Sequence, residues 1–77
     1  MIKKRLSLML ECELCVMQIA INKSARVATL FVSDFNESTR VMLDLDSKKI
    51  ISNRDEIRFT TSDINNIVAE IKKLLKE

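Results

Sequence analysis

The fold is decided by the stretch Phe59-Thr60-Thr61-Ser62-Asp63-Ile64 and its continuation to Glu77. Apolar residues recur there at three- and four-residue intervals, which at about 100° per residue places them on one side of a helix. Thr60 suits the N-cap, Asp63 stands at the capping-box position, and Phe59 is placed to staple against Ile64. The apolar side chains are Ile64, Ile67, Val68, Ile71, Leu74 and Leu75. We therefore predict an amphipathic C-terminal helix that needs a surface to pack on.

The chain from residue 26 to residue 59 has the pattern of antiparallel strands. Residues 26–33 carry apolar groups on both faces, as a central strand does, and residues 39–45 alternate apolar with polar side chains. Short segments rich in Asn, Asp and Ser separate these strands. A further extended stretch begins at Ile50 and resumes at Ile57. We predict a single α+β domain over residues 1–77, an antiparallel β-meander of about four strands followed by one C-terminal amphipathic helix.

Residues 6–21 allow two interpretations. Every second residue from Leu6 to Val16 is apolar, which indicates a strand, and the alternation then shifts so that Met17, Ile19 and Ile21 are apolar. A bulge near Val16, or a break between two strand halves, would produce the shift. A helix is the alternative, but Glu13 would lie at the centre of its apolar face. We favour the strand.

The composition argues against catalysis. The chain has 77 residues, a net charge of +2, and neither His nor Gly. It therefore lacks the commonest general base and any glycine-rich phosphate loop. We predict no enzyme, no catalytic residues, no cofactor and no metal. So small a domain is marginally stable alone, and we expect a homodimer.

The N-terminus begins with Met1-Ile2-Lys3-Lys4-Arg5 before an apolar run, as a signal peptide does. Glu11 and Glu13 interrupt that run, and it is too short and too charged to span a bilayer. We predict a cytoplasmic or intracellular protein with no membrane partner.

The second face of the predicted sheet is not wholly polar. Met9, Ala28, Met42 and Ile51 are expected to lie on it. A homodimer formed through the sheet or the helix would cover such a face.

Cys12-Glu13-Leu14-Cys15 has the spacing of a redox or metal motif. On a strand, residues three apart point to opposite faces, so the two thiols would diverge. A zinc site would also need two further ligands. We interpret the cysteines as small buried hydrophobic residues.

Basic residues in the strand and turn region suggest a binding surface. If they line one face of the sheet, they form an electropositive groove that can follow a phosphate backbone. Phe35, in a turn, is the plausible stacking platform for a base. The alternative is a solvated surface of mixed charge. The predicted nucleic-acid-binding residues are Arg26, Arg40, Lys48, Lys49, Arg54, Arg58 and Phe35.

Three segments carry a resemblance to a known family. They are Phe31-Val32-Ser33-Asp34-Phe35, the strand from Val41 to Leu45, and Arg54-Asp55-Glu56-Ile57-Arg58-Phe59-Thr60 before the helix. From about Arg26 onward the chain resembles the positive cofactor four family of single-stranded-DNA-binding transcriptional coactivators.

The resemblance implies a four-stranded sheet that binds nucleic acid and a helix that forms the dimer interface. It implies phosphate contacts from Arg26, Arg40, Arg54 and Arg58, with Phe35 at the family's aromatic position. The helix residues of the implied interface are Ile64, Ile67, Val68, Ile71, Leu74 and Leu75. Asn36 and Glu56 stand where the family has glycine, and Glu56 would repel phosphate.

Two functions follow as hypotheses. The first is a small homodimer that binds single-stranded nucleic acid through its sheet, with a role in transcription or replication. The second is a protein–protein interaction module, such as a small viral or mobile-element inhibitor or a subunit of a larger assembly.

Overall fold

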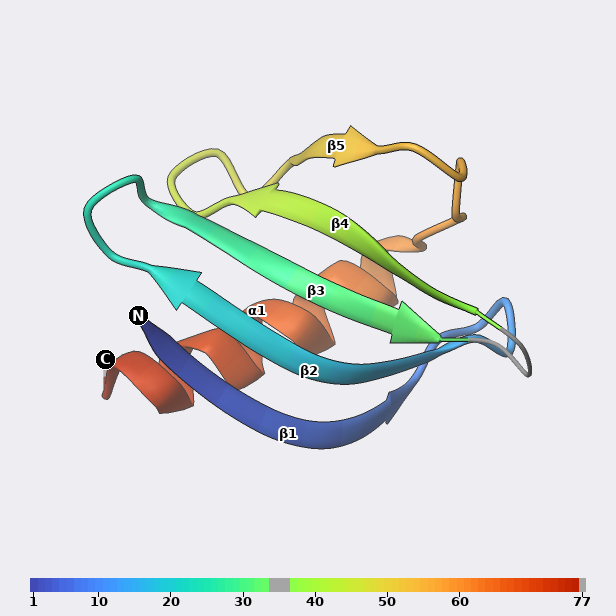
Figure 1. Ribbon diagram of the computed structural model, residues 1–77, viewed down its shortest axis with the longest axis horizontal. Helices are drawn as coiled ribbons and strands as arrows, with labels where there is room; N and C mark the ends of the chain where they lie inside the picture. The colour runs from blue at the N-terminus through green and yellow to red at the C-terminus, as the bar shows by residue number, and fades with distance from the viewer. Residues whose placement is uncertain (34–36, 77) are drawn as a thin grey trace.

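The computed structural model describes residues 1–33 and 37–76, in which five strands precede one helix (Figure 1). Every neighbouring pair of strands is antiparallel, and the strand order follows the chain order. The helix covers one face of the sheet. The predicted α+β meander with a C-terminal helix is confirmed. The elements are β1 (Ile2–Met9), β2 (Cys15–Asn22), β3 (Val27–Ser33), β4 (Ser38–Asp44), β5 (Ile50–Asn53) and α1 (Thr61–Leu75).

The ambiguous N-terminal segment forms two strands, so the helical alternative for it is wrong. The strands are separated by a tight turn, in which the Glu13 N–H donates to the Leu10 carbonyl over 3.0 Å and the Leu10 N–H donates to the Leu14 carbonyl over 2.8 Å. Glu13 has φ 73°, the left-handed conformation that closes a three-residue hairpin loop. The described chain therefore has five strands where we expected about four.

The shift in alternation is also explained by a bulge. The register between β2 and β3 changes between Val16 and Gln18, which leaves Met17 as an extra residue. Val16 and Ile19 both remain buried on the helix side, whereas Met17 is 46% exposed. The predicted bulge is confirmed. The shifted alternation grouped Met17 with Ile19 and Ile21, but Met17 is not buried with them.

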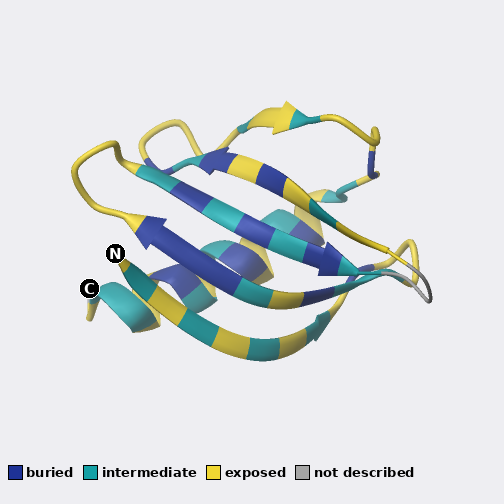
Figure 2. Ribbon diagram, in the orientation of Figure 1, coloured by how far each residue is buried: buried dark blue, intermediate teal, exposed yellow. Residues whose placement is uncertain are grey.

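The helix begins where the sequence predicted. The Asp63 N–H donates to Thr60 Oγ1 and the Thr60 N–H donates to Asp63 Oδ2, both over 3.1 Å, which forms the capping box. Figure 2 shows the buried stripe of α1 facing the sheet. Ile67 and Ile71 are buried there, and Ala28 is likewise fully buried on the core side, which corrects its expected place on the second face.

The main core is a single cluster between the sheet and the helix. Because Ile67 and Ile71 belong to it, these two predicted dimer-interface residues are already covered by the protomer's own sheet. The other four, Ile64, Val68, Leu74 and Leu75, are half-buried. The strand and turn residues of the cluster are Leu10, Val16, Ile19, Ile21, Ala28, Leu30, Val32, Val41, Leu43, Leu45 and Ile57.

The chain makes its tight turns without glycine. Several turns and the helix C-cap instead hold a charged residue in the left-handed region, at a cost of roughly 1–2 kcal/mol each. Among the described residues, those with positive φ are Glu13, Arg26, Lys48, Glu56 and Lys76.

Candidate nucleic-acid interface

The sheet face turned away from α1, called the open face below, carries the side chains that alternate with the core residues. On β3, Thr29 and Phe31 point to this face because Ala28, Leu30 and Val32 are buried on the other. The same alternation on β1 assigns Lys3 and Arg5 to the open face (Figure 2).

A row of four residues crosses the open face at its centre. Arg5 of β1 pairs with Gln18 of β2, Gln18 pairs with Phe31 of β3, and Phe31 pairs with Arg40 of β4. The Arg40 guanidinium carbon lies 5.8 Å from the centroid of the Phe31 ring, within cation–π range. An aromatic ring with Arg40 on one side, and Gln18 and then Arg5 on the other, is therefore the central feature of this face.

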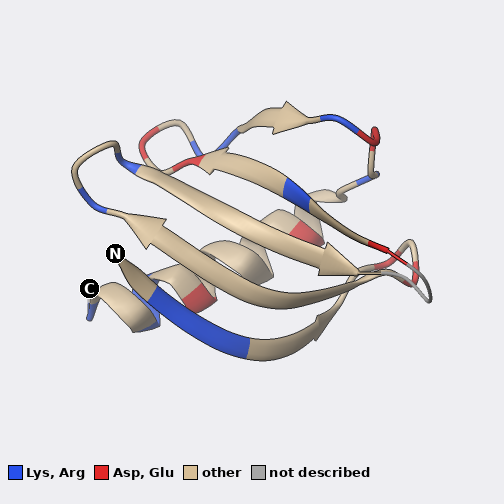
Figure 3. Ribbon diagram, in the orientation of Figure 1, with Lys and Arg blue, Asp and Glu red and all other residues tan. Residues whose placement is uncertain are grey.

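A groove of about 750 Å³ runs along the same face, within the volume range of ligand sites. Phe31 and Arg40 contribute to its lining, with Lys3 on β1 and Arg54 beyond β5 as further cations. Figure 3 shows the basic residues of β1 and β4 on the sheet. The remaining lining residues are Met1, Thr29, Ser38, Thr39, Met42 and Ser52.

Arg54 is held at the groove by the loop after β5. The Asn53 side-chain amide donates to the Ile57 carbonyl over 2.7 Å, and the Ile57 N–H donates to Asn53 Oδ1 over 2.9 Å. The Glu56 N–H also donates to the Asn53 carbonyl over 3.0 Å, with Glu56 in the left-handed region at φ 53°. Asn53 thus closes the loop that presents Arg54.

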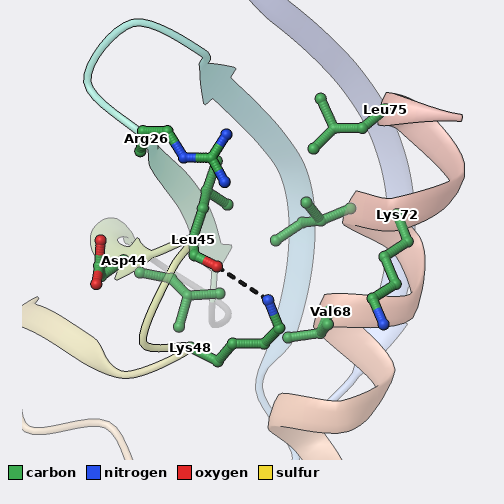
Figure 4. A pocket seen from close by; sticks show the side chains of 9 residues that line it. Arg26, Asp44, Leu45, Lys48, Val68, Lys72 and Leu75 are labelled. Carbon is green, nitrogen blue, oxygen red and sulfur yellow. Dashed lines mark hydrogen bonds between the residues drawn. The ribbon is translucent and has the colours of Figure 1, made fainter. Parts of the chain in front are cut away.

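Other predicted basic residues lie elsewhere. Arg26 and Lys48 line a different cavity, between the end of β4 and α1, that shares no lining residue with the groove (Figure 4). Arg26 Nη2 lies 2.8 Å from Asp46 Oδ1, and Lys48 Nζ donates to the Leu45 carbonyl over 2.9 Å. This cavity measures only about 40 Å³, well below the roughly 150 Å³ of a cavity known to admit benzene. It is too small for a base.

The rim of the small cavity is nonetheless charged. Lys72 of α1 and Asp44 of β4 also contribute to its lining (Figure 4). Hydrogen bonds from the side chain and backbone of Ser47 hold the pKa of Asp44 below its ordinary value of 3.8, so this carboxylate is ionised at neutral pH.

Of the seven predicted binding residues, the groove brings together Arg40 and Arg54. Lys49 and Arg58 are exposed but do not contribute to its lining, and Phe35 lies outside the described residues. Sequence reasoning missed Phe31, Lys3 and Arg5. The signal for Phe31 was its position between Leu30 and Val32, since alternation sends it to the opposite face from both.

The two cysteines are not the pair of buried residues we expected. Cys12 is exposed in the turn before β2, and Cys15 is half-buried beside Ser7, with 3.4 Å between Sγ and Oγ. Both thiols are free. No group of three potential metal ligands occurs in the part of the chain that the structure describes.

Among residues 1–33 and 37–76, no helix combines the length and apolar character that crossing a membrane requires. No family model, curated protein or solved structure matches this chain. The resemblance to the positive cofactor four family therefore stays a hypothesis, carried by the residues quoted for it.

Proposed function

We propose that this protein is a small non-enzymatic homodimer that binds single-stranded nucleic acid across the open face of its sheet. The observation that carries the proposal is the Phe31 ring at the centre of that face, 5.8 Å from the Arg40 guanidinium and inside the groove. Bases present a flat π surface whatever their identity, so one stacks on Phe31 without sequence preference. Arg40 contributes charge and a planar group at the same point.

Phosphates are bound by the cations that surround this ring. Lys3 and Arg54 line the groove, and Arg5 ends the row that crosses the sheet. A single strand lying over Phe31 therefore meets positive charge on both sides. The net charge is only +2, so binding depends on this local arrangement rather than on the overall field. A role in transcription or replication would use this same face.

The direct test measures the fluorescence anisotropy of a labelled oligothymidylate at several salt concentrations. Wild-type affinity should fall steeply as salt rises, because each phosphate contact releases counterions. Phe31→Leu keeps an apolar side chain but removes the stacking surface, and should weaken binding about tenfold, near the lower end of the energy assigned to base–aromatic stacking. Absence of binding at low salt, or a Phe31→Leu protein that binds like wild type, contradicts the proposal.

A protein partner is the second candidate function, and a specific observation favours it. All four methionines are exposed, and flexible methionines suit adaptable binding surfaces. Met42 lies in the groove itself, and Ile51 on β5 is 55% exposed. A protein bound through these apolar groups would remain bound at high salt and would require Met42, whereas a nucleic acid would dissociate.

A further inference from the structure

Among residues 1–33 and 37–76, no strand pairs with the outer edge of β1. In the sheet order of these residues β1 comes first, and its neighbour is β2. β1 runs for eight residues, whereas the strand at the opposite edge, β5, has four. Burial alternates along the whole of β1, although its register with β2 shifts between Arg5 and Leu8. An unpaired edge of this length presents a row of backbone donors and acceptors to another strand.

Partly exposed apolar side chains lie along this edge of the sheet. Leu6 and Leu8 point toward the helix side and pack against the core, yet both are only half-buried. Met9, on the open face, is 64% exposed. A further strand beside β1 would cover these side chains, so the edge has both the backbone groups and the apolar contacts that a docking strand needs.

The positive charges of β1 are concentrated in one half of the strand, and this distribution indicates which strand can pair with its edge. Its N-terminal half contains Lys3, Lys4 and Arg5, whereas residues 6–9 have no charge. A parallel neighbour of the same sequence in register would place each cation opposite its counterpart, which is unfavourable. An antiparallel neighbour would place each cation opposite an uncharged residue.

We propose that β1 pairs with β1 of a second copy of this chain, antiparallel and centred on Leu6. In this register Leu6 lies opposite its own counterpart, Arg5 opposite Ser7, Lys4 opposite Leu8, and Lys3 opposite Met9. Each pair has both members on the same face of the sheet, as antiparallel pairing requires. The pairing joins two five-stranded sheets into one.

The Lys4 side chain suits this arrangement. Its Nζ lies 3.5 Å from Glu70 Oε2 of α1, so the side chain already extends over the helix side of β1. The methylenes of a lysine cover apolar surface while its ammonium group stays in water. Opposite Leu8 of the second copy, the Lys4 stem covers that leucine while its head group keeps the contact with Glu70.

The pairing also extends the open face. Lys3 and Arg5 of both copies then lie along the seam, between two grooves that each contain Phe31. A longer single strand could then contact both copies. This consequence rests on the proposed function, whereas the strand pairing itself does not.

The test is sedimentation equilibrium in the absence of nucleic acid, with two variants that differ only in the sign of the added charge. Ser7→Lys with Met9→Lys places cations opposite Arg5 and Lys3 of the second copy, and Ser7→Glu with Met9→Glu places anions there. Both positions are exposed in the single chain, so the fold is retained, as circular dichroism would verify.

Wild type should dimerise, and the lysine variant should dimerise at least tenfold more weakly than wild type. The glutamate variant should dimerise more tightly at low salt than at high salt. A wild-type monomer at all concentrations overturns the proposal. So does equal dimerisation of the two variants, which would place the interface on another surface such as the helix. Because no nucleic acid is present, either result tests the strand pairing and leaves the proposed nucleic-acid binding to its own experiment.

Discussion

The carboxylate of Asp63 binds the backbone of Glu11, which joins the first turn of α1 to the turn between β1 and β2. The Glu11 N–H lies 3.2 Å from Oδ1 and 3.4 Å from Oδ2. Oδ2 also accepts from the N–H of Thr60, which completes the capping box. Asp63 is only 2% exposed, so its hydrogen bonds are shielded from water. One carboxylate thus positions the helix against the N-terminal hairpin.

Removing that carboxylate should destabilise the protein. Asp63→Ala removes the side-chain half of the capping box and leaves the Glu11 and Thr60 donors without their partner, and we expect the free energy of unfolding to fall by about 2–3 kcal/mol. Asp63→Asn keeps one acceptor oxygen and should lose roughly half as much. Urea unfolding measures both. Ser62→Ala, at an exposed neighbouring position, is the control, and equal effects at the two positions would contradict this role for Asp63.

Glycine at the helix C-cap should stabilise the chain. Lys76 adopts φ 58° and ψ 42°, a conformation that glycine reaches without steric cost. Lys76→Gly should therefore raise the free energy of unfolding by about 1 kcal/mol. Lys73→Gly, the same change inside the helix, should lower it by about 1 kcal/mol. Thermal unfolding measures both changes. If the two variants change the free energy of unfolding in the same direction, this explanation is excluded.

Much of the fold could be predicted because local signals agree with it. Thr60 and Asp63 mark the helix start, and the spacing of Ile67 and Ile71 identifies its buried face. The extra strand was missed because the turn after β1 contains no Gly, Pro, Asn or Asp. Glu13 takes the left-handed position there, and sequence patterns rarely indicate a glutamate in that role.

The candidate site was harder to predict because it depends on which strands are neighbours. Arg26 and Arg40 looked equivalent in the sequence, yet one lies beside Asp46 at the end of the sheet and the other beside Phe31 on the open face. Arg5 joins Phe31 and Arg40 in one row only through the pairing of four successive strands. The stacking role of Phe35 stays a prediction.

Acidification should lower the free energy of unfolding in part because Glu70 becomes protonated. Burial raises its pKa, but contacts with Lys73 and Lys4 outweigh this and hold the pKa below its ordinary value of 4.5. A lowered folded-state pKa gives stability that is present above pH 4.5 and is lost as the pH falls through the folded-state value. The stability of Glu70→Gln should therefore fall less than that of wild type between about pH 5 and pH 3. Denaturant unfolding at each pH tests this, with Glu11→Gln as an exposed carboxylate control; parallel pH profiles for wild type and Glu70→Gln would contradict it.

The two groups of basic residues should differ in nucleic-acid binding although their charges are equal. Arg40→Gln with Arg54→Gln removes two cations from the groove, and should reduce the slope of log affinity against log salt by about 1.4, since each single-strand phosphate contact contributes about 0.7. Arg26→Gln with Lys48→Gln removes the same charge from around the small cavity, where Arg26 is paired with Asp46 and Lys48 donates to a backbone carbonyl. That control should leave the slope unchanged. Equal losses in the two double variants would mean that binding follows net charge, and the groove around Phe31 would then have no special role.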